Sequence, residues 1–335
     1  MRILYIGRAG FGAMGEAATY QYASIASRRH DVLVLAPQQP NAPEKIVFSD
    51  SEVAVADIYS PVVTAQIDNV YQHIRRFRPD IIHMIQSPLC FHYPYYLRHL
   101  TSCKWLIDFR SPYVGGKKDP ALQRYFYLQF YVDGILTHFM PSLKTNIRLR
   151  LRRAHEIPPG VDLSLFAENI QSASRTLPRK FVFIGSINER RKLEFLVTAF
   201  GEFSKGNNHD ATLDIYGAGN ALEKLSRCID EHSLNQQITL RGVLPQQELL
   251  KRLQTYDAGI AYVPYEHFSL APSLKSLEFA AAGIPVLASD TVGHRVYNQK
   301  YGFRFKLFRN TVDDFCAVMS AVAHGGVTKN DIFTN

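Results

Sequence analysis

The chain has 335 residues, 46% of them hydrophobic, and this length and composition fit a globular protein of about two domains. A transmembrane helix is excluded because no apolar run reaches about 18 residues, and no signal peptide is expected. Residues 1–160 hold 19 Lys and Arg against 12 Asp and Glu, whereas the remainder holds 19 against 18, so we expect an anionic partner for the first half.

Strand and helix patterns alternate along the first half of the chain. Short apolar runs predict strands at 2–7, 31–37, 81–85, 104–109, 134–140 and 155–159. Helical patterns lie between them, such as 16–28 and 67–77. This alternation is typical of a parallel sheet with helices on both faces.

A glycine-rich loop follows the first predicted strand. Gly10, Gly12 and Gly15 spell G-x-G-x-x-G, a pattern that lets the backbone approach a phosphate at the start of a helix. A dinucleotide site also needs an acidic residue after the second strand to hold the ribose, but that strand ends at Ala36 without one. We therefore expect Gly12 and Gly15 to face a phosphate ligand other than NAD.

The strand and helix pattern restarts in the second half. Strands are predicted at 180–185, 212–217, 237–242, 258–264, 284–289 and 302–306, with helices such as 191–203 and 246–254. We expect an N-terminal domain at 1–160, a polar linker at 161–178, a second α/β domain at 179–322 and a tail at 323–335. Ligands bind at the carboxyl ends of such sheets, so a site between the two domains is predicted.

Three stretches of the second half carry a resemblance. They are HEIPPGVDLSLF at 155–166, FVFIGSINERRKLEFLVTAF at 181–200, and the segment from YDAGIAYVP to SDTVG at 256–293. In this order and spacing they resemble the retaining GT-B glycosyltransferases of the GT4-like family. The resemblance covers most of the chain and is strongest over 156–296. It implies an α/β GT-B fold, in which two Rossmann-like doubly wound domains face each other across a cleft.

The segment SLKSLE, at 273–278, matches the donor site of that family. A nucleotide-sugar presents phosphates and a ribose diol, which need amides, cations and a carboxylate. Ser273 and Leu274 open a predicted helix, Lys275 adds a charge, and Glu278 follows about one turn later. The family's Glu at this place holds the ribose hydroxyls. The alternative, a solvated Glu278, is disfavoured by the apolar run that follows it.

The same region departs from the family at several positions. The first Glu of the family's E-x7-E motif would stand at 270, where this chain has Leu270, and Ala271 and Ser273 replace glycines. That Glu contacts the donor sugar in the family, so the sugar is not predicted here. Glu266 is acidic and close in sequence, but its spacing does not fit a simple substitute.

A second phosphate element is GSINERRKL, at 185–193. Ser186 occupies the position of the family's usual Arg, and Arg191 aligns with its Lys. A planar guanidinium suits a diphosphate, and an anion would relieve the conflict between a cation and a predicted helix start. The resemblance adds Gly242, in the matching stretch ITLRG, to the expected donor contacts.

Asp108 and Arg110 stand at the end of the strand predicted at 104–109, on one face of the chain. The family often places a His-Asp or Arg-Asp pair here that points at the sugar, but Ser111 replaces the Asp. A catalytic role and an internal salt bridge are equal alternatives for Asp108 and Arg110. His83, at another strand end, is interpreted as a core histidine.

Basic residues alternate with apolar ones near 144–153. We expect either an amphipathic element with one solvated face or adhesion to anionic lipid headgroups. The tyrosine-rich stretch 91–105 would suit the same membrane surface, and no nucleic-acid-binding module is visible. The basic residues are Lys144, Arg148, Arg150, Arg152 and Arg153.

Together these features predict a retaining hexosyltransferase that uses a nucleotide-sugar and a lipid-linked or saccharide acceptor. Arg191, Lys275 and helix-start amides would stabilise the leaving diphosphate, so neither a metal ion nor another cofactor is expected. The 4 scattered cysteines favour a cytoplasmic protein, with peripheral contact at the inner face of the membrane as an option. Two alternatives stay open: a nucleotide-sugar epimerase, and a degenerate member acting as a nucleotide- or membrane-binding partner subunit.

Overall fold

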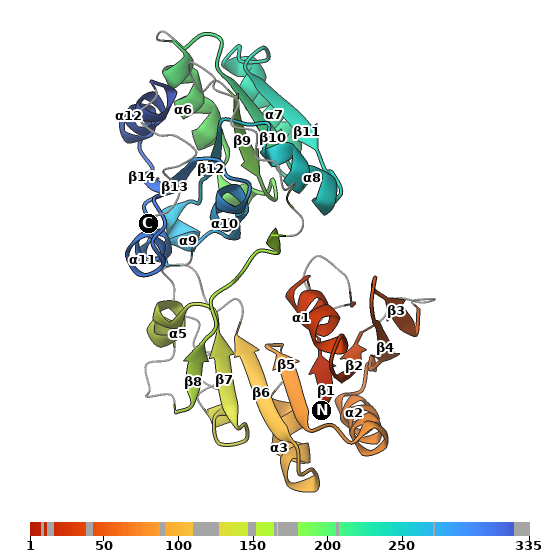
Figure 1. The fold of residues 1–335 in the computed structure, drawn as a ribbon. Coiled ribbons are helices and arrows are strands. Elements are labelled where there is room, and N and C mark those ends of the chain that lie inside the picture. The colour runs from red at the N-terminus through yellow and green to blue at the C-terminus, as the bar shows by residue number, and fades with distance from the viewer. Residues whose placement is uncertain are drawn as a thin grey trace. The chain divides into compact units, whose positions relative to one another are not determined.

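The computed structural model describes residues 1–7, 10–11, 17–37, 43–87, 91–109, 127–146, 152–163, 166, 180–205, 208–270 and 272–324. The described residues fall into two compact α/β units, one up to Pro158 and the other from Pro159 onward (Figure 1). Across the described part of the chain, no helix has the length and hydropathy needed to cross a membrane.

Unit 1 is an eight-stranded sheet in the order β3-β4-β2-β1-β5-β6-β7-β8. Its strands run parallel, except that β3 pairs antiparallel with β4. The strands are β1 (Arg2–Ile6), β2 (Asp31–Ala36), β3 (Lys45–Val47), β4 (Glu52–Asp57), β5 (Ile81–Ile85), β6 (Lys104–Phe109), β7 (Gly134–Thr137) and β8 (Ala154–Glu156). The helices are α1 (Ala17–Ser27), α2 (Val63–Phe77), α3 (His92–Leu97) and α5 (Met140–Asn146), and α3 continues into the 3-10 turn η2 (Arg98–Leu100).

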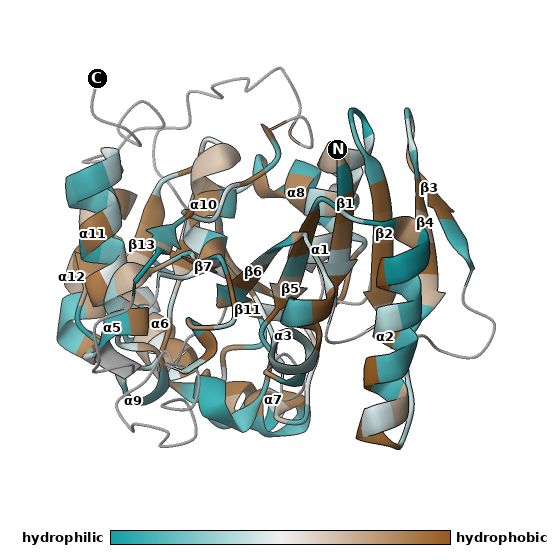
Figure 2. Ribbon diagram, turned by 90° about the horizontal axis from the view of Figure 1, so that it is seen from below, coloured by the Kyte–Doolittle hydropathy of each residue, from teal (hydrophilic) through white to brown (hydrophobic). Residues whose placement is uncertain are grey.

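Helices cover both faces of this sheet because its strand residues are apolar on both sides. On one face α1 packs against β1 and β2, with Ala23 among the buried residues. On the other face α2 buries Val70 and Ile74, which are one helical turn apart, and α3 and α5 join the same core. The remaining residues of α2 are largely polar, and both colours run along this helix in Figure 2.

Unit 2 is a six-stranded, fully parallel sheet in the order β11-β10-β9-β12-β13-β14. Its helices again lie on both faces, with α6, α7 and α12 in one core and α8, α10 and α11 in the other. The strands are β9 (Lys180–Ile184), β10 (Thr212–Tyr216), β11 (Ile238–Gly242), β12 (Ala258–Ala261), β13 (Val286–Ser289) and β14 (Lys306–Phe308). The helices are α6 (Glu194–Ser204), α7 (Leu222–Glu231), α8 (Gln246–Leu253), α9 (Tyr265–Phe268), α10 (Leu274–Ala281), α11 (Val292–Tyr301) and α12 (Val312–Ala323).

Several predictions about elements were wrong in place or in extent, and the strand expected at 155–159 forms at Ala154–Glu156. The strands β3 and β4 were not predicted, because they are short and include charged residues. The strand expected at 302–306 forms at 306–308, after a stretch in which the Phe303 and Phe305 rings pack against each other. The strand expected at 134–140 ends at Thr137. The helix expected from 191 begins at Glu194 as α6, and Arg191 belongs to the preceding 3-10 turn η5 (Glu189–Arg191).

Candidate functional site

The loops after β9 and β10 pack so closely that only glycine fits between them. A Cβ added at Gly217 would lie 1.8 Å from the carbonyl oxygen of Gly185, and one added at Gly219 would lie 2.1 Å from that of Ile187. The N–H of Ile187 donates to the carbonyl of Ala218 at 2.9 Å, which joins the two loops. This contact sets the path of the chain from Gly185 into η5.

Arg191 lies over an aromatic ring at the edge of this loop. Its guanidinium carbon is 4.2 Å from the centre of the Phe268 ring, which belongs to α9. The next residue, Lys192, forms an ion pair with Glu266 of the same helix. Two contacts therefore join helix α9 to the loop that follows β9. The Phe268 ring contacts the face of the Arg191 guanidinium, so the N–H groups at its edge can still donate to a ligand.

Lys275 brings a second cation to the same place. Its side chain passes over Gly185, where an added Cβ would lie 2.9 Å from the Lys275 Cε atom. Burial, followed by the nearby charge of Arg191, lowers the pKa of Lys275. Burial, followed by Arg190, likewise lowers the pKa of Arg191. Two partly buried cations thus lie close enough to lower the pKa of Lys275, an arrangement that favours an anionic ligand.

Glu278 lies one turn further along α10 and is also partly buried. Burial raises its pKa, and Lys275 opposes this rise. In the described part of the chain, no hydrogen bond or ion pair is formed by the Lys275 ammonium or the Glu278 carboxylate. A carboxylate in this environment can accept hydrogen bonds from a ligand diol.

The start of α10 lies beside these charges. Ser273 is the residue before the helix, and its side chain does not cap the helix start. Its own N–H donates instead to Nε2 of the buried His294 at 2.9 Å. Leu274, the first residue of α10, is 53% exposed, so solvent reaches the helix start at this residue.

The other predicted donor residues have different surroundings. Ser186 is exposed, and its hydroxyl accepts from the side-chain amide of Asn188 at 3.2 Å. The carbonyl of Gly242 accepts from the N–H of Gly217 at 2.8 Å, so Gly242 supports the loop after β10. Their direct contact with a donor stays a prediction.

On unit 1, Asp108 pairs with His83. The Nε2 atom of His83 lies 3.3 Å from a carboxylate oxygen of Asp108, and both side chains are buried. The His83 ring also packs against Tyr5 and Tyr22, at 5.3 and 5.7 Å between ring centres. A catalytic role for Asp108 stays a prediction, and Arg110, Gly12 and Gly15 lie outside the described residues.

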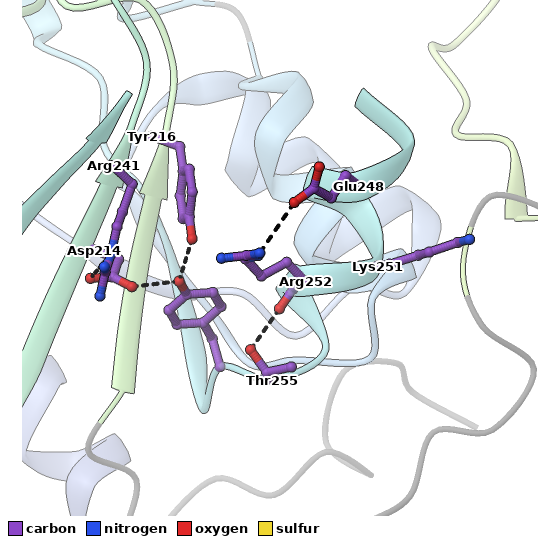
Figure 3. Close-up of a pocket in the computed structure, with 8 residues that line it drawn as sticks. Asp214, Tyr216, Arg241, Glu248, Lys251, Arg252 and Thr255 are labelled. Atoms are coloured by element: carbon purple, nitrogen blue, oxygen red, sulfur yellow. Dashed lines mark hydrogen bonds and ion pairs between the residues drawn. The ribbon is translucent and has the colours of Figure 1, made fainter. Parts of the chain in front are cut away.

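A separate pocket of about 540 Å³ lies beside β10, β11 and α8. The Tyr256 hydroxyl donates to Asp214 at 2.6 Å and lies 2.9 Å from the Tyr216 hydroxyl, and Arg241 pairs with Asp214 at 3.0 Å (Figure 3). Because these groups satisfy one another, we interpret the pocket as a polar brace between two strands and α8. The other lining residues are Glu248, Lys251, Arg252 and Thr255.

Four residues that contribute to the site around Arg191 were not predicted from the sequence. Gly217 ends the strand predicted at 212–217 and Gly219 follows it, so their spacing alone indicates a tight loop. Phe268 and His294 gave no such sign, because each meets its partner only through the folding of unit 2.

The C-terminal part of the chain matches a known family. Residues 167–329 match the family described as Glycosyl transferases group 1. No curated protein sequence matches the chain.

Solved structures resemble the chain over nearly its whole length. Sucrose-phosphate synthase from Thermosynechococcus elongatus gives a TM-score of 0.73 at 16% identity, covering 97% of this chain and 91% of that chain. The lipopolysaccharide outer core galactosyltransferase WaaB, in its apo form, gives 0.71 at 16% identity, covering 98% and 92%. Anabaena HepE in complex with UDP gives 0.71 at 13% identity, covering 96% and 89%. At these identities the likeness shows the fold, which is GT-B.

Proposed function

We propose that this chain, whose residues 167–329 match the family described as Glycosyl transferases group 1, is a retaining hexosyltransferase that uses a nucleoside-diphosphate sugar. The observation that carries the proposal is the group formed by Arg191, Lys275 and Glu278 beside the open start of α10. This group offers two cations, backbone donors and one carboxylate within a single unit.

The two cations fit a diphosphate. Arg191 presents a planar fork above Phe268, and Lys275 adds a point charge from the first turn of α10. A bound diphosphate would bring both pKa values back towards their ordinary range, because its negative charges favour the charged forms of Arg191 and Lys275. Arg191 and Lys275 would thereby neutralise the leaving group without a metal ion.

Glu278 fits the ribose of the donor. It lies one turn from Lys275 on α10, so a ligand whose phosphates meet Lys275 would present its ribose diol near Glu278. In the bound state two hydroxyl donors would favour the charged carboxylate over the protonated form that burial favours.

The placement of the donor determines how the sugar would pass to the acceptor. The acceptor oxygen forms a bond to the anomeric carbon on the face from which the diphosphate leaves, as the bond between that carbon and the phosphate oxygen breaks. The acceptor proton passes to the departing diphosphate, which Arg191 and Lys275 hold. No protein nucleophile is needed for retention by this course.

We further propose a lipid-linked acceptor, because unit 1 carries an exposed aromatic surface beside basic residues. The Tyr95 and Tyr131 rings lie 5.2 Å apart, and the N–H of Arg152 donates to the Gln129 side chain at 2.9 Å. Arg152 and Arg153 are exposed. We propose that the exposed residues of this region act as one surface, which we name the aromatic–basic patch: Tyr95, Tyr96, Leu100, Tyr127, Phe130, Arg152 and Arg153. Such a surface fits an anionic bilayer.

Donor binding is tested by calorimetric titration of the wild-type chain with UDP, GDP, ADP, dTDP and NAD. UDP is the first ligand to try, because the HepE structure contains it. Replacing Arg191→Ala, Lys275→Met or Glu278→Gln should each weaken binding by about 10- to 100-fold, since each removes a charge-assisted contact. Arg190→Ala, an exposed neighbour, and Tyr256→Phe, in the polar brace, should leave the affinity within about threefold.

The outcomes separate the alternatives. Binding of one nucleoside diphosphate together with release of free diphosphate and a glycosylated acceptor supports transfer. Binding with conversion of the donor into an epimer supports the epimerase. Binding of NAD alone, or of none of the five ligands, contradicts the proposal, and the latter favours a partner subunit.

A further inference from the structure

The first turn of α11 holds the segment that leads into α10. His294 is fully buried, and its Nδ1–H donates to the carbonyl of Ser289 at 2.7 Å. This bond leaves Nε2 as the acceptor for the N–H of Ser273 at 2.9 Å. One imidazole therefore connects the end of β13 to the start of α10.

A second bond holds the other end of the same segment. The N–H of Val292, also in the first turn of α11, donates to the carbonyl of Ser269 at 3.1 Å. Ser269 and Ser273, which stand on either side of Leu270 in the sequence, are thus each bonded to α11. The resemblance places the sugar-contacting position at Leu270, and Ser273 is followed closely by Lys275.

Ser289, whose carbonyl accepts from His294, belongs to a network of hydrogen bonds. The N–H of Val263 donates to the Ser289 hydroxyl at 3.0 Å, and that hydroxyl donates to the Asn310 side chain at 2.9 Å. The Asn310 amide returns a bond to the carbonyl of Val263 at 2.9 Å. The ends of β12 and β13 are joined in this way, so the carbonyl that His294 contacts has a fixed place.

The charge state of His294 agrees with this role. Burial lowers its pKa to about 4, so the imidazole is neutral at neutral pH and keeps a lone pair on Nε2. The Thr291 hydroxyl, which caps α11 by accepting from the N–H of His294, lies 3.1 Å from Nδ1. The Phe305 ring packs edge-on against the His294 ring, with 6.0 Å between the ring centres.

We propose that His294 is a positioning residue for donor binding. It sets the place of Ser273, and through Ser273 the direction of the first N–H groups of α10 and of Lys275. This inference rests on the proposed function of the site.

Two substitutions separate the two hydrogen bonds of His294. In His294→Gln the amide oxygen reaches the place of Nε2 and keeps an acceptor for Ser273. In His294→Asn the shorter amide reaches only the place of Nδ1, keeps a donor for Ser289 and leaves the N–H of Ser273 without a partner. Both variants lose ring packing, so a merely structural role predicts the same result for both.

We expect His294→Asn to weaken UDP binding about tenfold and His294→Gln to weaken it less than threefold, with similar losses of Tm. Tyr256→Phe serves as a control that loses Tm and keeps its UDP affinity. Equal UDP affinity in the two His294 variants would overturn the inference, provided that the wild type binds UDP. If no nucleotide binds to the wild type, the proposed function fails instead.

A measurement on the unaltered chain covers the case in which the variants do not fold. Nitrogen-15 NMR of the histidines should show one imidazole that stays neutral at pH 6, with its proton on Nδ1. A proton on Nε2 would remove the acceptor for Ser273 and contradict the inference.

Discussion

Lys275 and Glu278 lie in surroundings that disfavour the charged form of both side chains. Burial lowers the pKa of Lys275 and raises that of Glu278, so each side chain would be less costly to the folded chain in its neutral form. Functional sites commonly accept such a cost in stability. The cost of burying these charges can therefore be measured as a change in the stability of the ligand-free protein.

We predict that Glu278→Gln is more stable than the wild type at pH 8, by about 2–4 °C in Tm. Because the folded-state pKa of Glu278 is raised, its favourable contribution is complete below the ordinary glutamate pKa and is lost as pH rises through the raised value. The gain should therefore shrink as pH falls. Thermal melts from pH 8 to pH 4 check this, with the exposed Glu44→Gln as a control that should show little change.

At the scale of elements, the close approach of two loops decides where the cations lie. The loop after β9 carries Gly185 and η5, and the loop after β10 carries Gly217 and Gly219. A side chain at either of the last two positions would meet backbone, which cannot yield as a flexible side chain does. The positions of Arg191 and Lys275 therefore depend on the close backbone approach that Gly217 and Gly219 permit.

We predict that Gly219→Ala destabilises the chain by about 1–3 kcal/mol, as overpacking does elsewhere. Its Cβ would lie 2.1 Å from the carbonyl oxygen of Ile187. Gly160→Ala is the matched control, since a Cβ there meets nothing within 4 Å. Denaturant melts of the two variants give the comparison, and an equal effect would contradict the importance of this loop contact.

At the scale of the whole molecule, the excess positive charge and the exposed aromatic side chains occur on the same unit. Tyr96 and Phe130 are 54% and 66% exposed, and Arg152 and Arg153 lie in the same patch. Unit 2 instead keeps Lys and Arg nearly balanced by Asp and Glu. This division favours a role for unit 1 at an anionic surface and for unit 2 at the donor.

We predict that the wild-type chain sediments with vesicles that contain phosphatidylserine and not with purely zwitterionic ones. Arg152→Gln together with Arg153→Gln should weaken this binding by roughly 30-fold, at about 1 kcal/mol for each charge. Tyr96→Ser with Phe130→Ser should also weaken it. Val47→Ser with Tyr59→Ser, two exposed apolar positions elsewhere on unit 1, should not. Equal binding to both kinds of vesicle would contradict the role of the patch.

The α/β class, most strands and the placement of Lys275 and Glu278 on one helix follow from the amino-acid sequence alone. Strand periodicity and helix spacing are local properties, and a buried parallel strand is an apolar run that can be read directly. The short strands β3 and β4 escaped this reading because their alternation includes charged residues.

The contacts that hold the site in place depend on the three-dimensional fold. Phe268 reaches Arg191 across 77 positions of the chain, and His294 reaches Ser273 across 21. The fold also has the turn η5 at Arg191, where a helix was expected to begin. The reason is that the glycine contacts of the neighbouring loop govern the path of the chain there. Such contacts depend on which strands lie side by side, and local sequence pattern does not contain that order.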